Sequence, residues 1–160
     1  MADGITKNFD SLMCVDIADM LNKYTAKVDQ VIPIVKEEID KAAEQVKRDI
    51  DNGVRAEHYQ TGELASSLTI SPLASNDKPN AKKYGYEIEF KGENAHGVPY
   101  AKIANILNYG RDAFEGSKTK KAYGGIEGSH FIDEAIRPLK GLTKRISERI
   151  EKHLLDSEKK

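Results

Sequence analysis

Apolar side chains recur every three or four positions through the first third of the chain. This spacing lines them up along one side of a helix, because an α-helix completes a turn in about 3.6 residues. Pro33 interrupts the stripe, and proline removes a helical hydrogen bond and restricts the residue before it. We therefore predict a helical arm over residues 13–53, in two segments with a kink or break between residues 30 and 33. Gly53 predicts its end, since glycine enters the left-handed conformation that ends helices without strain.

The middle of the chain changes to the alternation of apolar and polar residues that is typical of strands. The alternation is clearest over residues 84–91, where one set of side chains is aromatic or aliphatic and the other is mostly charged. A shorter alternation over residues 68–71 leads to Pro72, which ends a strand or confines it to a sheet edge. We predict an antiparallel strand pair with its apolar face against helices. Its charged face presents Glu87 and Glu89, which are candidate interface residues.

A short helix is predicted after the strands. Pro99 suits the first turn of a helix, and a short apolar stripe runs from it to the Tyr109-Gly110 pair. Residues 61–110 should therefore hold the strand pair and this helix. Tyr100 and Tyr109 flank the helix, and core packing is the first interpretation of both rings. A role in an interface is the second interpretation.

A loop and a last helix follow. Glycines and charged residues without an apolar period predict a mobile loop over residues 111–129, with a short hairpin at residues 122–126. A renewed helical stripe then predicts a C-terminal helix over residues 130–155. Pro138 and Gly141 interrupt this stripe, so a bend is expected there.

The length of the chain bounds its architecture. Its 160 residues suffice for one domain with a real core but not for two, so we predict a single domain over residues 1–160. The expected class is α+β, with a small antiparallel sheet packed against the long kinked N-terminal helical arm and the C-terminal helix. No apolar run nears the ~20 residues of a membrane span, and the first residues lack the pattern of a signal peptide. Neither membrane insertion nor this route of secretion is expected.

The residue types that carry catalysis and metal binding are sparse and widely spaced. The four histidines form no His-x-x-x-His pair, and the lone Cys14 excludes an intrachain disulfide and a zinc site built from several thiolates. Ser66-Ser67 lacks the Gly-x-Ser-x-Gly elbow of a nucleophile. The glycines of residues 124–128 lack the lysine and hydroxyl of a phosphate loop. We predict no enzyme activity, no cofactor and no metal site.

Charge is nearly balanced along the chain, with 25 Lys and Arg against 26 Asp and Glu, so contact with nucleic acid needs a local patch. The candidate patch lies on the predicted loop and consists of Arg111, Lys118, Lys120 and Lys121. One interpretation is a solvated loop that charge keeps soluble. The other is a docking loop or a contact with DNA phosphates, which is independent of base sequence and sensitive to salt.

Three phrases follow one another in a fixed order: YQTGELASSL at residues 59–68, VPYAKIANILNYGR at residues 98–111 and GSHFIDEAI at residues 128–136. In this order they resemble a family of small phage and prophage morphogenesis proteins, whose members complete the tail or join it to the head in long-tailed phages. The family pattern ends in Phe-x-x-x-Ala at the start of the last helix, where we predict that Phe131 is buried between this helix and the sheet. The family often has an acidic residue before its aromatic-Gly pair, where this chain has Asn108.

The resemblance implies a virion structural protein of the neck or upper tail that acts in tail completion or head-to-tail joining by ring assembly. The implied partners are further copies of this chain in a six-fold ring, neighbouring head-connector or tail proteins, and channel DNA contacted non-specifically by the basic loop. Before assembly the protein would lie in the host cytoplasm. The alternatives are a cytoplasmic regulatory or nucleic-acid-associated binding protein that uses the basic loop, and an enzyme whose site the sequence does not reveal.

Overall fold

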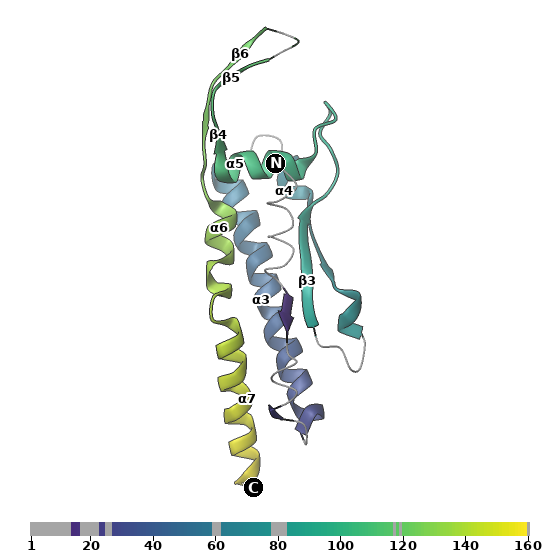
Figure 1. Cartoon of the computed structure of the whole chain (residues 1–160). Coiled ribbons are helices and arrows are strands. Elements are labelled where there is room, and N and C mark those ends of the chain that lie inside the picture. Colours follow the sequence, from purple (N-terminus) through teal and green to yellow (C-terminus); the bar gives the residue numbers. More distant parts are fainter. Residues whose placement is uncertain are drawn as a thin grey trace.

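The computed structural model describes residues 14–16, 23–24, 27–58, 62–77, 83–116, 118 and 120–159. It is a mixed structure of helices and antiparallel sheets, which confirms the predicted α+β class (Figure 1). The helices are α3 (Val28–Glu57), α4 (Glu63–Ser66), α5 (Tyr100–Tyr109), α6 (Phe131–Ile136) and α7 (Leu142–Glu158), with 3₁₀ turns η2 (Ala74–Asp77) and η3 (Arg137–Leu139). The strands are β1 (Cys14–Asp16), β2 (Leu68–Pro72), β3 (Lys83–Phe90), β4 (Gly110–Arg111), β5 (Phe114–Glu115), β6 (Ala122–Tyr123) and β7 (Ile126–Glu127).

The helix α3 lies between two layers (Figure 1). Helices α6 and α7 pack along one side of it, and strands β2 and β3 pack along the other. Two clusters of buried apolar side chains follow one another along α3. The first joins its C-terminal half to α4, α5, α6 and the sheet, and the second joins its N-terminal half to α7 and Tyr84. The fold is therefore organised around one long helix that is apolar on more than one side.

The helix α3 is continuous from Val28 to Glu57, so of the kink or break predicted between residues 30 and 33 the break is wrong. Pro33 lies in the second turn, where only a short piece of helix precedes it and one backbone hydrogen bond is lost. Val31 and Val35 on either side of it are fully buried, and their packing holds this turn in place. Residues 14–16, which the sequence assigns to the helical arm, form β1 instead. Three residues are too few for periodicity to separate a strand from a helix.

The helix α3 also continues past Gly53, where the sequence predicts its end. A Cβ atom at Gly53 would lie 2.7 Å from the Cβ of Phe131 on α6, closer than two carbon atoms can approach. Gly53 is therefore needed for the close approach of two helices and does not end α3. The predicted burial of Phe131 is confirmed, but the side chain packs against α3 at Gly53 and not simply between the last helix and the sheet, and its ring lies 5.6 Å from that of His58.

The predicted strand pair is part of a three-stranded antiparallel sheet in the order β1-β3-β2. In the register of β2 with β3, Leu68 lies opposite Phe90 and Ser71 lies opposite Glu87. The predicted faces are confirmed, because Tyr84 and Ile88 are buried while Glu87 is partly exposed. The sheet therefore turns one face to α3 and shows a polar face on its other side.

Residues 110–127, hereafter the arm, form a two-stranded antiparallel ribbon that projects beyond α5 (Figure 1). Strand β4 pairs with β7 at its base, β5 pairs with β6 further out, and all of the arm except residues 117 and 119 is described. The sequence predicts a mobile loop without regular structure at residues 111–129, and the paired strands show that the absence of regular structure is wrong, while the mobility stays a prediction. The hairpin predicted at residues 122–126 is wrong as well, since these residues lie together on the returning strand. Backbone pairing across the ribbon leaves no apolar period in the sequence, and periodicity was the signal on which the prediction depended.

The C-terminal segment bends where the sequence predicts. Helix α6 ends at Ile136, the 3₁₀ turn η3 includes Pro138, and α7 begins after Gly141, whose φ of 83° lies in the left-handed region. This break lets α6 pack against one part of α3 and α7 against another. The two core clusters depend on it.

Tyr86 ties the sheet to α3, because its hydroxyl donates a hydrogen bond to a carboxylate oxygen of Asp40. This bond is the main cause that raises the pKa of Tyr86 to about 12, and burial of the ring is the next.

The raised pKa of Tyr86 makes the stability of the fold depend on pH. Its contribution to stability is complete below about pH 10 and is lost as the pH rises through about 12. The Tyr86→Phe variant should lack this loss, so the stability difference from the natural chain should shrink between about pH 9 and pH 12. Urea unfolding of both proteins across this pH range measures the difference in stability. The Asp40→Asn variant should show the same shrinking difference from the natural chain. A difference that stays constant across the range would contradict the prediction.

Candidate functional site

The three ordered phrases of the sequence come together at one end of the molecule. The Tyr100 hydroxyl donates to a carboxylate oxygen of Glu63 at 3.1 Å, which joins the second phrase to the first. The backbone N–H and the hydroxyl of Ser129 both donate to the carbonyl of Leu107, at 3.0 and 3.1 Å, which joins the third phrase to the second. Segments that lie far apart in the chain thus build one end of the fold.

Asn108 is the polar side chain at the centre of this end, and it is completely buried. Its Oδ1 accepts the backbone N–H of Ile132 at 2.7 Å, and its Nδ2 donates to Asp133 at 3.4 Å. It thereby caps α6, whose N-cap residue His130 makes no side-chain cap of its own. This role of Asn108 was not predicted from the sequence. The available signal was an amide in the place where the resembling family often has an acidic residue.

At the base of the arm, the backbone segments that contain Gly110 and Gly128 pass each other in close contact. A Cβ at Gly128 would lie 2.6 Å from the carbonyl oxygen of Asn108 and 2.6 Å from the carbonyl carbon of Tyr109. A Cβ at Gly110 would lie 2.5 Å from the carbonyl oxygen of Ile126, and Gly110 has a φ of 79°. Both contacts are with backbone, which cannot move aside as a flexible side chain can. The base of the arm is therefore fixed to α5 and to the start of α6.

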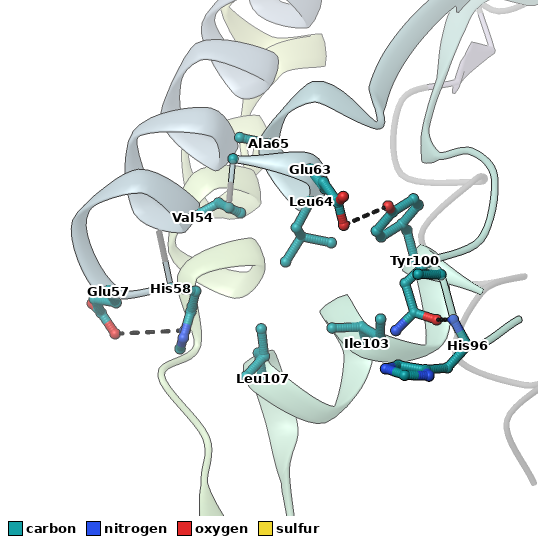
Figure 2. Close-up of a pocket in the computed structure, with 13 residues that line it drawn as sticks. Val54, Glu57, His58, Glu63, Leu64, Ala65, His96, Tyr100, Ile103 and Leu107 are labelled. Carbon is teal, nitrogen blue, oxygen red and sulfur yellow. Dashed lines mark hydrogen bonds and ion pairs between the residues drawn. The ribbon is translucent and has the colours of Figure 1, made fainter. Parts of the chain in front are cut away.

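A cleft of about 610 Å³ opens beside α5, between the end of α3, α4 and the loop at residues 91–99, and is hereafter the cleft (Figure 2). Figure 2 shows the apolar side chains of Leu64, Ile103 and Leu107 around this space. Polar side chains also line this space. The residues of this polar set are Glu57, His58, Glu63, Asn94, His96 and Tyr100. The cleft is lined by apolar and by polar side chains, and two of the polar ones are acidic.

One polar contact of the cleft, between His58 and Ser129, does not have the arrangement that activates a nucleophile. His58 Nε2 lies 2.8 Å from the Ser129 hydroxyl, which donates its proton to the carbonyl of Leu107. A catalytic serine would instead donate to the histidine. Burial, followed by the hydrogen bond to Glu63, raises the pKa of the Tyr100 phenol, so this ring stays neutral as a hydrogen-bond donor. Among the described residues, no three His, Cys, Asp or Glu side chains are placed to hold a metal ion.

The arm carries a pair of aromatic rings on its outer half. Phe114 and Tyr123 stack with their centroids 5.0 Å apart and an angle of 14° between the planes, and 47% of Phe114 is exposed. The guanidinium of Arg111 lies 4.8 Å from the Phe114 centroid, and the ammonium of Lys121 lies 5.8 Å from that of Tyr123. Aromatic rings and arginine are enriched at surfaces that bind a partner.

The structure divides the predicted basic patch. Arg111 lies on β4 at the base of the arm, while Lys118, Lys120 and Lys121 lie at its tip. The five residue steps from Arg111 to Gly116 correspond to about 17 Å along a strand, at about 3.4 Å per residue. The patch is therefore a cluster of three lysines at the tip and a separate arginine that is stacked on Phe114.

The residues predicted for an interface lie at two places. Glu87 and Glu89 lie on the polar face of the sheet, where Glu89 forms an ion pair with Lys91 at 2.9 Å. Tyr100 lines the cleft. Tyr109 is 45% exposed, and its hydroxyl donates to Asp133 at 3.2 Å. The structure brings Tyr100 and Tyr109 to the end that carries the cleft and the arm.

Comparison with known proteins adds no relative. No protein-family model matches the chain, and no curated protein or solved structure is significantly similar to it. None of the helices in the described part of the chain is both long enough and apolar enough to cross a membrane. A function is therefore inferred from the sequence phrases and from the surfaces at one end of the fold.

Proposed function

We propose that this protein is a structural component of a phage or prophage particle, located in the neck or upper tail, where it completes the tail or joins it to the head. The first support is the order of the three phrases, which resembles that of small morphogenesis proteins. The second is that the same phrases meet at one end of the fold, through the contacts of Tyr100, Asn108 and Ser129. They describe one structural unit and not three scattered matches.

The observation that carries the proposal is the arm. A two-stranded ribbon is at best marginally stable alone, and its unpaired edges and exposed rings invite a neighbour. Here it projects from the body (Figure 1). Phe114 on it is half-exposed, and three lysines lie at its tip. Such a surface is typical of a site that binds a partner. The protein would thus act by binding and not by catalysis.

Ring assembly is the proposed mechanism. A contact between two different surfaces of identical subunits closes into a ring when the rotation between them allows it. Each lateral contact can be weak alone, below about 1,200 Å², and become strong when several form together. A ring in the tail would follow its six-fold symmetry, and tip lysines repeated in every subunit could contact channel DNA. The partners would then be copies of this chain and the head-connector or tail proteins above and below it.

The test is made on assembled particles. We expect the tagged protein to remain with the neck or tail of purified particles, and deletion of its gene to leave heads and tails unjoined or tails incomplete. Electron microscopy of the deletion lysate and the titre of infectious particles measure this result. A protein from the same gene cluster that has no structural role in the particle, tagged in the same way, controls for adventitious association. Joined particles at normal titre, without the tag, would show that the proposal is wrong.

A second function is favoured by the lysines at the tip. A two-stranded β-ribbon fits the major groove of DNA, and Lys118, Lys120 and Lys121 would contact its phosphates. This alternative describes a cytoplasmic regulatory or nucleic-acid-associated protein. On this alternative the purified protein binds duplex DNA. The logarithm of its binding constant should fall with the logarithm of the salt concentration, with a slope of about −0.9 for each phosphate neutralised. Tight salt-sensitive binding together with normal particles after gene deletion would favour it over the structural proposal.

A further inference from the structure

We propose that the arm of one copy of this chain inserts its tip into the cleft of a neighbouring copy. The inference rests on the proposed function in naming the subunit contact of the ring, but it needs only two copies of the chain. It assigns a single occupant to the cleft, namely the outer half of another subunit's arm. Three observations support it: the charges of tip and cleft are opposite, both have apolar surface, and the arm and the cleft both adjoin α5.

The charges of the two surfaces are opposite. The tip carries Lys118, Lys120 and Lys121, and neither Lys118 nor Lys120 forms an ion pair with the described residues. The rim of the cleft carries Glu57 and Glu63. Over half of the Glu57 side chain is exposed, and its described ionic contact is with His58 at 4.0 Å. Positive tip and negative rim would steer two copies into register and disfavour contact of two arms or two clefts.

The apolar surfaces also match. The stacked rings of Phe114 and Tyr123 lie just behind the tip. The interior of the cleft is apolar at Leu64, Ile103 and Leu107. A volume of about 610 Å³ is within the range of pockets that bury a ligand the size of several side chains. One aromatic ring with a lysine beside it is therefore of a suitable size, and burial of the ring would supply the apolar part of the contact.

The geometry favours exchange between subunits that stand side by side. The arm leaves the C-terminal end of α5 at Gly110, while the cleft lies against the turns from Tyr100 to Leu107. Each subunit thus presents a donor surface and a different acceptor surface at the same end of the molecule. Contacts of this kind are head-to-tail, so they propagate around a ring and satisfy every arm and every cleft when the ring closes.

The test is a disulfide between two differently tagged chains. Both carry Cys14→Ser, which removes the chain's one natural cysteine. One then carries Lys118→Cys at the tip of the arm, and the other carries Glu57→Cys at the rim of the cleft. We expect a mixed dimer on mild oxidation, both at high protein concentration and in cells that produce particles. The matched control replaces Glu57→Cys with Lys152→Cys, an exposed position on α7 away from the cleft, and should give little or no mixed dimer.

A charge exchange provides a second measurement on the same variants. The double change Lys120→Glu with Lys121→Glu on the arm, or Glu63→Lys in the cleft chain, should each lower the yield of mixed dimer by about tenfold, because like charges then face each other. Combining the arm and cleft changes should restore the yield. A yield that neither change alters, or that the control pair equals, would overturn the proposal even if a dimer forms.

The remaining outcomes separate this inference from the proposed function. A disulfide that forms only when both cysteines are in one chain would put the arm in its own cleft and overturn the exchange. A bond from the arm cysteine to a different particle protein would identify another occupant and overturn it as well, while supporting the structural role. If mixed dimers of this chain form but the protein is absent from particles, the arm exchange would be supported and the assignment to the neck or tail would be rejected.

Discussion

Replacement of Phe131 by alanine is expected to lower the free energy of unfolding by about 3–5 kcal/mol. The side chain is only 4% exposed, and it fills the space between α6 and α3 where Gly53 allows the two helices to approach. The loss combines the transfer of the ring to water with the cavity that remains. Since small domains have about 5–15 kcal/mol in total, the variant should lose a large part of its stability. Urea unfolding monitored by circular dichroism measures the change.

The control for Phe131 is Leu155→Ala on α7, because 59% of Leu155 is exposed. Its replacement should change the free energy of unfolding by no more than about 0.5 kcal/mol. Equal midpoints for Phe131→Ala and the natural chain would mean that the ring does not pack between the helices. The Phe-x-x-x-Ala phrase would then belong to an interface and not to the core.

Replacement of Asn108 by alanine is expected to cost about 1–3 kcal/mol, because the backbone N–H of Ile132 is left buried without an acceptor. The natural side chain is completely buried and accepts this N–H at 2.7 Å. The start of α6 and the base of the arm depend on the same contact. Amide hydrogen exchange at Ile132, compared with that of the α3 core, should therefore accelerate in the variant by more than a global loss of stability explains.

Two further variants make the role of Asn108 specific. Asn105→Ala changes the same residue type on the same helix at a partly exposed position, and should alter stability by about 0.5 kcal/mol or less. Asn108→Asp keeps an acceptor for Ile132 but puts a second carboxylate beside Asp133, whose Oδ2 lies 3.4 Å from the amide nitrogen. It should therefore lose more stability at neutral pH than in mild acid. Equal stability of Asn108→Ala and the natural chain would exclude the capping role.

Long regular patterns predicted the structure well, and short or non-local features did not. The alternation at residues 84–91 repeats often enough to define a strand and both of its faces, which the structure confirms. Gly53 was misread because a glycine that ends a helix and one that admits a neighbouring ring look alike in sequence. Strand β1 is too short for a period, and the arm is held by pairing between its two strands. Hydrogen bonds across a ribbon leave no repeat along the chain.

The candidate site was foreseen only in part. The lysines of the tip and Tyr100 were singled out from the sequence, but the cleft was not, because its walls come from α3, α4, α5 and the loop at residues 91–99. Nothing local in the chain marks a space enclosed by segments so far apart. The grouping of Arg111 with the lysines was misleading for the opposite reason. Residues close in sequence are held well apart once a strand extends between them.

The two paired stretches of the arm share one register, with Arg111 opposite Ile126 and Phe114 opposite Tyr123. Arm length is consequently a property that can change without any change in the body. Adding or removing two residues on each strand would move the tip by about 7 Å and keep every side chain on its face, whereas one residue on each would turn the rings over. The close backbone contacts of Gly110 and Gly128 at the base of the arm would not change. In the proposed ring, a longer or shorter arm would thus span a different gap between subunits with the same end of the fold.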